Sequence, residues 1–159
     1  MSSNSSAAEP EFRALGAVGT LVEESFAALQ RELPEAHLRI REHLAELSLR
    51  VRVDDERFGL AFSAAQVQVT AQHGVAVARV RTRRAAIAAL LDGNISLADA
   101  VLEDRLQVLA PLEVLARLQE GLRLYVHGAV RCVSFPELLR RFRALEPGQE
   151  NPSGDRGER

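Results

Sequence analysis

The segment from Val75 to Leu109 constrains the fold of this chain more than any other part of the sequence. It reads as a strand, a short helix that ends at Gly93, a second short helix that begins after Ser96, and another strand. Glycine is common just after a helix and serine just before one, which supports both boundaries. Two short helices between two strands need a sheet to pack on, so the segment predicts a domain with both α and β structure.

The residues before this segment alternate between apolar and polar side chains, which is the pattern of strands with one buried face. Short polar links separate the alternating runs: the turn Asp54-Asp55-Glu56, expected to be a solvated charge run, and the pair His73-Gly74. Such links favour an antiparallel meander with one face in water. The predicted strands lie at residues 47–53, 58–62, 67–71 and 75–81, and a fifth follows at 106–110.

Helical periodicity appears on both sides of the strands. Apolar residues recur every three or four positions from Ala14 to Leu29, and Pro34 suits the first turn of a second helix. Beyond Pro111, a longer apolar stripe is formed by Leu112, Leu115, Leu118, Leu122 and Tyr125. Because helices and strands occur in blocks, the predicted fold class is α+β: a five-stranded, mainly antiparallel sheet with helices packed chiefly on one face.

Side chains that can cap helices stand before three of the predicted helices. The expected caps are Thr82 for the helix at 83–91, Ser96 with Asp99 for the next helix, and Ser134 with Glu137 for the last, which has Val133 and Leu138 as a hydrophobic staple.

The order and spacing of these elements resemble the sterol carrier protein type 2 (SCP2-like) family of lipid-binding domains. The resemblance covers roughly Leu47 to Tyr125 and rests on order and spacing more than on signature side chains. The chain departs from the family pattern at Ala110-Pro111, where Gly-Asp is usual. The matching features are the strand end Val80 to Thr82, AIAALLDG at residues 86–93, LADAVL at 97–102 and RLQV at 105–108.

The resemblance implies an apolar tunnel between sheet and helices that holds a lipid, sterol, acyl chain or isoprenoid, with no shared catalytic residue and no cofactor. The alanines of the helix at 83–91 make it thin, which suits a cavity but equally suits close packing in a dry core. The residues expected to line the cavity are Phe58, Leu60, Phe62, Ile87, Leu90, Leu91, Val101, Leu102, Leu106, Leu115 and Leu118.

A basic cluster lies where the fourth strand meets the following helix. All 20 basic residues are arginine, and the net charge of −2 gives no global attraction for nucleic acid. Cations at the start of a helix oppose its dipole, so an anionic headgroup or membrane bound by Arg81, Arg83 and Arg84 would relieve that cost. The alternative is that these arginines are solvated or paired with nearby acidic side chains.

The sequence contains no motif that predicts catalysis or metal binding. Its four histidines are scattered, and Cys132, the single cysteine, is more readily explained as a small buried side chain than as a nucleophile with His127 as its base. We therefore expect a protein that is not an enzyme.

Two classes of function stay open. The first is a carrier of an apolar ligand. The second is an accessory or interaction subunit whose N-terminal amphipathic helices bind a protein partner or a second copy, with a vestigial cavity. Composition predicts disordered tails at residues 1–10 and 147–159 around one domain at 11–146, and the lack of a long apolar run or leader pattern predicts a cytoplasmic location.

Overall fold

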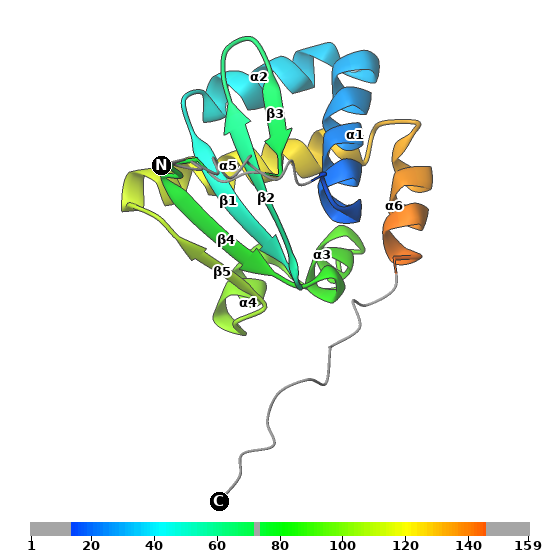
Figure 1. Cartoon of the computed structure of the whole chain (residues 1–159). Coiled ribbons are helices and arrows are strands. Elements are labelled where there is room, and N and C mark those ends of the chain that lie inside the picture. Colours follow the sequence, from blue (N-terminus) through cyan, green and yellow to red (C-terminus); the bar gives the residue numbers. More distant parts are fainter. Residues whose placement is uncertain (1–13, 72–73, 146–159) are drawn as a thin grey trace, which may run out of the picture.

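A computed structural model describes residues 14–71 and 74–145 of the chain (Figure 1). Both tails predicted from composition, at residues 1–10 and 147–159, lie outside these residues and stay predictions, and His73 also lies outside them. In chain order, the elements are α1 (Ala17–Glu32), α2 (Pro34–Leu44), β1 (Ser48–Val53), β2 (Glu56–Phe62), β3 (Val67–Thr70), β4 (Ala78–Thr82), α3 (Arg84–Leu91), α4 (Leu97–Leu102), β5 (Leu106–Leu109), α5 (Leu112–Ala129) and α6 (Phe135–Arg143).

The strands form one sheet in the order β3-β2-β1-β4-β5. Every neighbouring pair is antiparallel except β1 and β4, which are parallel. This confirms the predicted α+β class and the mainly antiparallel five-stranded sheet. The meander prediction is wrong at its fourth strand, because β4 pairs with β1 and not with β3. Alternating side chains determine which face of a strand is buried, and they leave the identity of its neighbour open.

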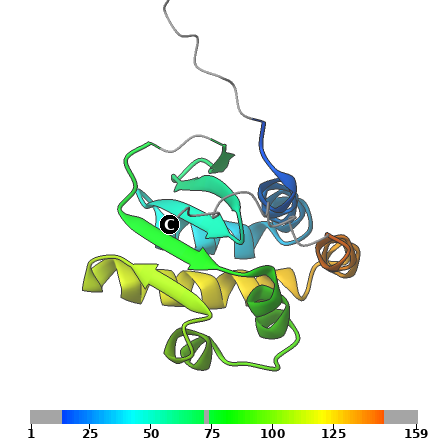
Figure 2. The ribbon, with the colours of Figure 1, turned by 60° about the horizontal axis from the view of Figure 1, so that its bottom comes forward.

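One face of the sheet forms the core with the helices. Figures 1 and 2 show the helices gathered on this side, with α5 running across it and α1 and α6 side by side at one flank. The register brings the inward side chains of neighbouring strands together, as in the pairs Val51 with Phe58 and Val51 with Val80. The buried inward residues of the sheet are Leu49, Val51, Val53, Phe58, Phe62, Val69, Ala78, Thr82 and Leu106.

Helix α5 packs closely against α2 through a face that contains a glycine. A Cβ atom at Gly121 would lie 2.5 Å from Leu44 Cδ2 and 2.7 Å from its Cγ, closer than real Cβ contacts. The stripe predicted for this helix is therefore partly wrong: Leu112 and Leu122 are exposed, whereas Val114 and Gly121 are buried. Hydrophobicity scales give glycine little weight, so the pattern alone favoured the leucines.

Replacing Gly121 by valine is expected to lower the free energy of unfolding by about 1–3 kcal/mol, because the buried side chain of Leu44 would have to shift to avoid a clash. Urea denaturation measures this change. The matched control is Ala116→Val, at an exposed position of the same helix, with an expected change within about 0.5 kcal/mol. A Gly121 variant as stable as wild type would mean that α2 and α5 are farther apart than described.

The predicted helix caps have three different outcomes. Ser96 does cap α4, since its Oγ accepts a hydrogen bond from the Asp99 N–H at 3.1 Å. Thr82 does not cap α3: it is the last residue of β4, and its hydroxyl donates to the Arg105 carbonyl at 2.9 Å. Ser134 does not form a capping box either, because its hydroxyl donates to the Glu32 carboxylate of α1.

The hydrophobic staple expected beside Ser134 is also absent. Val133 is 90% exposed, so it does not pack on the first turn of α6 as a staple requires. Glu137 instead forms an ion pair with Arg140, one turn farther along the same helix, at 2.5 Å. In this region a contact between α1 and α6 replaces the local capping that the sequence pattern predicted.

Candidate functional site

The eleven residues expected to line a cavity fall into three groups of different burial. Phe58, Phe62 and Leu106 are buried in the sheet core, and the rings of Phe26 and Phe62 meet edge to face with centroids 6.0 Å apart. Six others are half-buried: Leu60, Ile87, Leu90, Leu91, Leu115 and Leu118. Val101 and Leu102 of α4 are exposed, at 47% and 83%. The predicted lining residues therefore range from buried side chains of the sheet to exposed side chains of α4.

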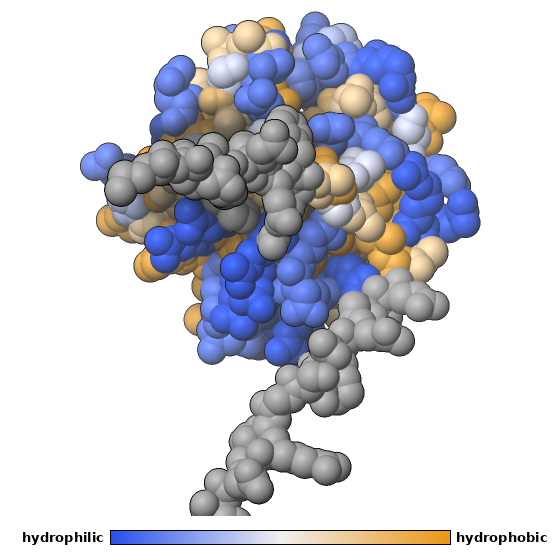
Figure 3. Space-filling model, in the orientation of Figure 1, coloured by the Kyte–Doolittle hydropathy of each residue, from blue (hydrophilic) through white to orange (hydrophobic). Residues whose placement is uncertain are grey.

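Large apolar side chains are exposed on α4, on β5 and at the start of α5. We call this the apolar edge; it consists of Val101, Leu102, Leu109 and Leu112. In Figure 3 hydrophobic surface lies along the margin of the molecule over β5 and the start of α5. Exposed apolar side chains that gather in one region often mark a surface that binds a partner or ligand.

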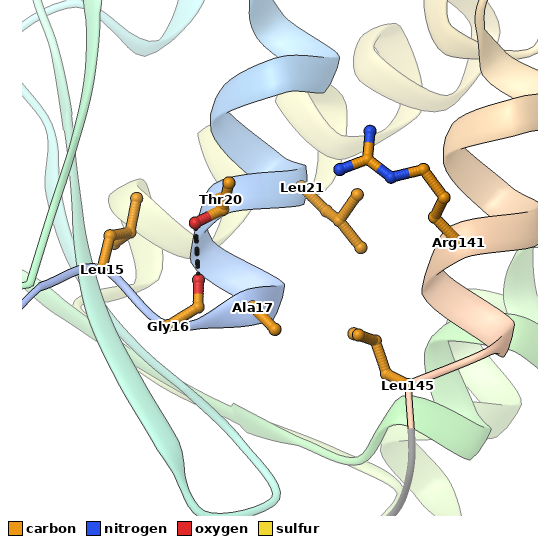
Figure 4. A pocket seen from close by; sticks show the side chains of 7 residues that line it. All are labelled: Leu15, Gly16, Ala17, Thr20, Leu21, Arg141 and Leu145. Atoms are coloured by element: carbon orange, nitrogen blue, oxygen red, sulfur yellow. Dashed lines mark hydrogen bonds between the residues drawn. The ribbon is translucent and has the colours of Figure 1, made fainter.

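A hollow of about 240 Å³ lies between the start of α1 and helix α6. Figure 4 shows Leu21 and Leu145 on opposite sides of it, with the Arg141 guanidinium at its border. Arg141 also pairs with Glu24 of α1. The hollow lies apart from the predicted lining residues, and its volume is below the range of about 300–1,000 Å³ that is typical of small-molecule pockets.

The turn between β1 and β2 uses its carboxylates to hold two helices. Glu56 accepts hydrogen bonds from the backbone N–H groups of Val18 and Gly19, both at 2.8 Å, at the N-terminus of α1. The N-cap residue of that helix has no side chain to do this, since it is Gly16. The interpretation of this turn as a solvated charge run is therefore wrong for Glu56, and only the tertiary structure reveals its role.

Asp54, in the same turn, binds the start of α3. Its Oδ2 atom accepts a hydrogen bond from Arg84 Nε at 2.7 Å and lies 3.4 Å from the Arg84 backbone nitrogen. The Arg84 cation therefore has a counter-charge, in line with the paired alternative for this member of the basic cluster. Arg83, the N-cap residue of α3, is exposed, and Arg81 is exposed on the outer face of β4.

Among the described residues, no hydrogen bond joins Cys132 to His127, the pair considered as nucleophile and base. Burial, with the negative charge of Glu32, raises the pKa of the Cys132 thiol, which makes it a poor nucleophile at neutral pH. Burial and the cation of Arg41 lower the pKa of His37, which favours the neutral form of its ring. Within residues 14–71 and 74–145, no three His, Cys, Asp or Glu side chains gather as a metal-binding group.

Among the helices that the structure describes, none combines the length and the apolar character needed to cross a bilayer.

The overall fold is that of SCP2-like domains. No protein-family model and no curated protein sequence matches the chain. A solved structure described as the UbiJ-SCP2 ubiquinone synthesis protein matches with a TM-score of 0.53 at 24% identity, over 68% of this chain and 95% of that one. Sterol carrier protein 2 like 2 from Aedes aegypti matches with a TM-score of 0.46 at 15% identity, over 65% of this chain and 94% of that one. The first likeness shows the SCP2-like fold that the sequence resemblance predicted.

Proposed function

We propose that this chain binds an apolar, lipid-like ligand and carries or presents it without catalysing a reaction. The observation that carries the proposal is the thin layer formed by α3 and α4 beside the apolar face of the sheet. Ala86 is the buried residue of α3, while the longer side chains Ile87, Leu90 and Leu91 are only half-buried. An apolar chain that displaced water from these side chains would gain about 25 cal/mol for each Å² that it covers.

The proposal assigns no chemistry to the protein. The thiol of Cys132 is buried with a raised pKa, and the carboxylates of Glu56 and Asp54 are engaged at the starts of α1 and α3. A binding or carrying role needs no reactive group. We retain the cytoplasmic location expected from the sequence as part of the proposal.

The ligand classes under the proposal are a lipid, a sterol, an acyl chain and an isoprenoid. All four classes follow from the resemblance to SCP2-like domains. An isoprenoid deserves the first test, because the neighbour at 24% identity is described as a ubiquinone synthesis protein. Extraction of the purified chain with organic solvent, followed by mass spectrometry, would identify a co-purifying ligand of any of these classes.

The accessory role stays an alternative, and the structure changes the surface it would use. The apolar stripe of α1 was expected to face a partner, but Val18, Phe26 and Leu29 are buried within the domain. A protein partner or a second copy would instead meet the apolar edge, where Leu102 and Leu112 are 83% and 82% exposed. A stable oligomer that yields no extractable ligand would favour this alternative.

Replacing Leu90 or Leu102 by tryptophan is expected to weaken binding of a fluorescent fatty acid, such as NBD-stearate. An indole at either position would fill space in the α3–α4 layer, and we expect at least about a tenfold loss of affinity, equivalent to about 1.4 kcal/mol. Fluorescence titration measures it. The effect of Leu90→Trp should be the larger, because Leu90 is half-buried and Leu102 is 83% exposed.

The matched control is Leu38→Trp, at a position of α2 that is 41% exposed and belongs to neither α3 nor α4. It should bind the fatty acid as wild type does, and all three variants should unfold cooperatively on heating. If both Leu90→Trp and Leu102→Trp bind like the control, the α3–α4 layer does not hold the ligand.

A further inference from the structure

The face of the sheet that is turned away from the helices carries a dense array of arginines. We call it the arginine face; it consists of Arg50, Arg52, Arg57, Arg79 and Arg81, on three adjacent strands. The register pairs Arg52 with Arg57 on one side and with Arg81 on the other, and it pairs Arg50 with Arg79 in the next row. Adjacent strands lie about 4.8 Å apart, so these side chains leave the sheet as close neighbours.

Few acidic side chains lie near the arginine face to neutralise its positive charge. Within the described part of the chain, the one carboxylate that pairs with the arginine face is Asp55, which is 72% exposed and lies 3.9 Å from the Arg52 guanidinium. Arg50 Nε is buried and has no hydrogen-bond partner there. Like charges directly opposite one another destabilise a sheet. An external anion would remove that cost and occupy the unpaired donors.

The geometry indicates an extended anionic surface more than a single small anion. Side chains on one face of a sheet stand roughly parallel to each other, so these guanidinium groups do not converge on one point. Arginine also matches the bidentate geometry of phosphate groups. Around the β1–β2 turn and the end of β4, the face visible in Figure 3 is strongly hydrophilic.

Apolar side chains border the arginine face on one side. Leu109, a member of the apolar edge, is 69% exposed and is the register partner of Arg79, while Val77 is 40% exposed just before β4. The described aromatic residues lie elsewhere, as with Phe58 and Phe62 in the core, so none of them offers a ring on this face for the bases of a single-stranded nucleic acid to stack on. Cations beside exposed aliphatic side chains suit the interface of an acidic bilayer.

We propose that the arginine face docks the protein on an acidic lipid bilayer, with Val77 and Leu109 entering the headgroup region at its border. The choice of a bilayer over another polyanion rests on the proposed function, because a carrier of an apolar ligand must meet the membrane that supplies or receives it. Docking places the β4–β5 side of the domain against the lipid. The apolar edge then lies next to the bilayer surface.

Cosedimentation with vesicles tests this docking. Wild-type protein should bind vesicles of phosphatidylcholine with about 30% phosphatidylserine, bind pure phosphatidylcholine weakly, and be released at about 0.5 M salt. The triple variant Arg52→Gln, Arg79→Gln, Arg81→Gln should lose at least about tenfold in affinity for the acidic vesicles. The matched control Arg39→Gln, Arg131→Gln, Arg140→Gln changes the net charge equally at exposed positions on the helical side and should lose less than about threefold.

Further measurements distinguish the docking of the arginine face from the proposed binding of an apolar ligand. The triple variant should still bind NBD-stearate, and Leu90→Trp should still bind acidic vesicles. Equal loss in the triple variant and its control would overturn the docking face, and so would tighter binding of wild type to duplex DNA than to acidic vesicles at the same salt. If the wild-type protein does not bind NBD-stearate, the proposed function is refuted. The vesicle comparison would still decide whether the arginine face binds an acidic bilayer.

Discussion

Replacing Phe58 by alanine is expected to lower the free energy of unfolding by about 3–5 kcal/mol, which is a large part of the stability of a domain of this size. Phe58 is 1% exposed and lies opposite Val51 at the centre of the sheet. Truncation would leave a cavity that the sheet cannot collapse to fill. Urea denaturation followed by circular dichroism measures the change.

The control for this variant lies two residues along the same strand and on the same face. Leu60 is half-buried, so Leu60→Ala is expected to cost less than about 2 kcal/mol. The comparison also tests the location of the cavity. A cost below about 1.5 kcal/mol for Phe58→Ala would indicate that its ring borders open space, as the sequence predicted, and does not fill a solid core.

Replacing Glu56 by alanine is expected to lower the free energy of unfolding by about 2–3 kcal/mol, although this residue is the last of an acidic turn whose sequence suggests a solvated charge run. Its carboxylate accepts the N–H groups of Val18 and Gly19, and without it two donors at the start of α1 lose their partners. The negative charge there also stabilises the positive end of the helix dipole. Thermal unfolding and urea denaturation should both report the loss.

Two further substitutions test whether the carboxylate of Glu56 stabilises the start of α1. Glu56→Gln keeps a carbonyl acceptor but no charge, so it should fall between wild type and the alanine variant. Asp55→Ala removes the neighbouring carboxylate, whose side chain is 72% exposed, and should change stability by less than about 0.5 kcal/mol. Equal effects at Glu56 and Asp55 would contradict the capping role and restore the interpretation of this turn as a solvated charge run.

The predictable parts of the fold are those that depend on local periodicity. The alternation around Val51 and Phe58 identifies both strands and their buried faces, and Ser96 caps α4 as its sequence position suggests. What could not be predicted depends on contacts between distant segments. The parallel partner of β1 begins at Ala78, and the carboxylate at the start of α1 comes from Glu56.

The candidate site likewise has features that local periodicity predicts and features that depend on contacts between distant segments. Sequence alone predicts that Phe62 and Leu106 face inward, but the exposure of Leu102 depends on how far α4 stands from the sheet. Arg81 belonged to a predicted basic cluster that was defined by neighbours in sequence. The register instead groups it with Arg52 and Arg57, because residues 52, 57 and 81 lie in one row across the sheet.

The parallel pairing of β1 with β4 has a consequence for synthesis of the chain. A ribosome delivers β1, β2 and β3 before residues 78–82 appear, so β1 first pairs with β2 alone and its other edge has no strand beside it. Unpaired strand edges recruit foreign strands and promote aggregation. A nascent chain stalled before Ala78 therefore exposes an unpaired edge of β1 that can bind strands of other chains. In the complete domain, β4 pairs with this edge, on the side of β1 opposite β2.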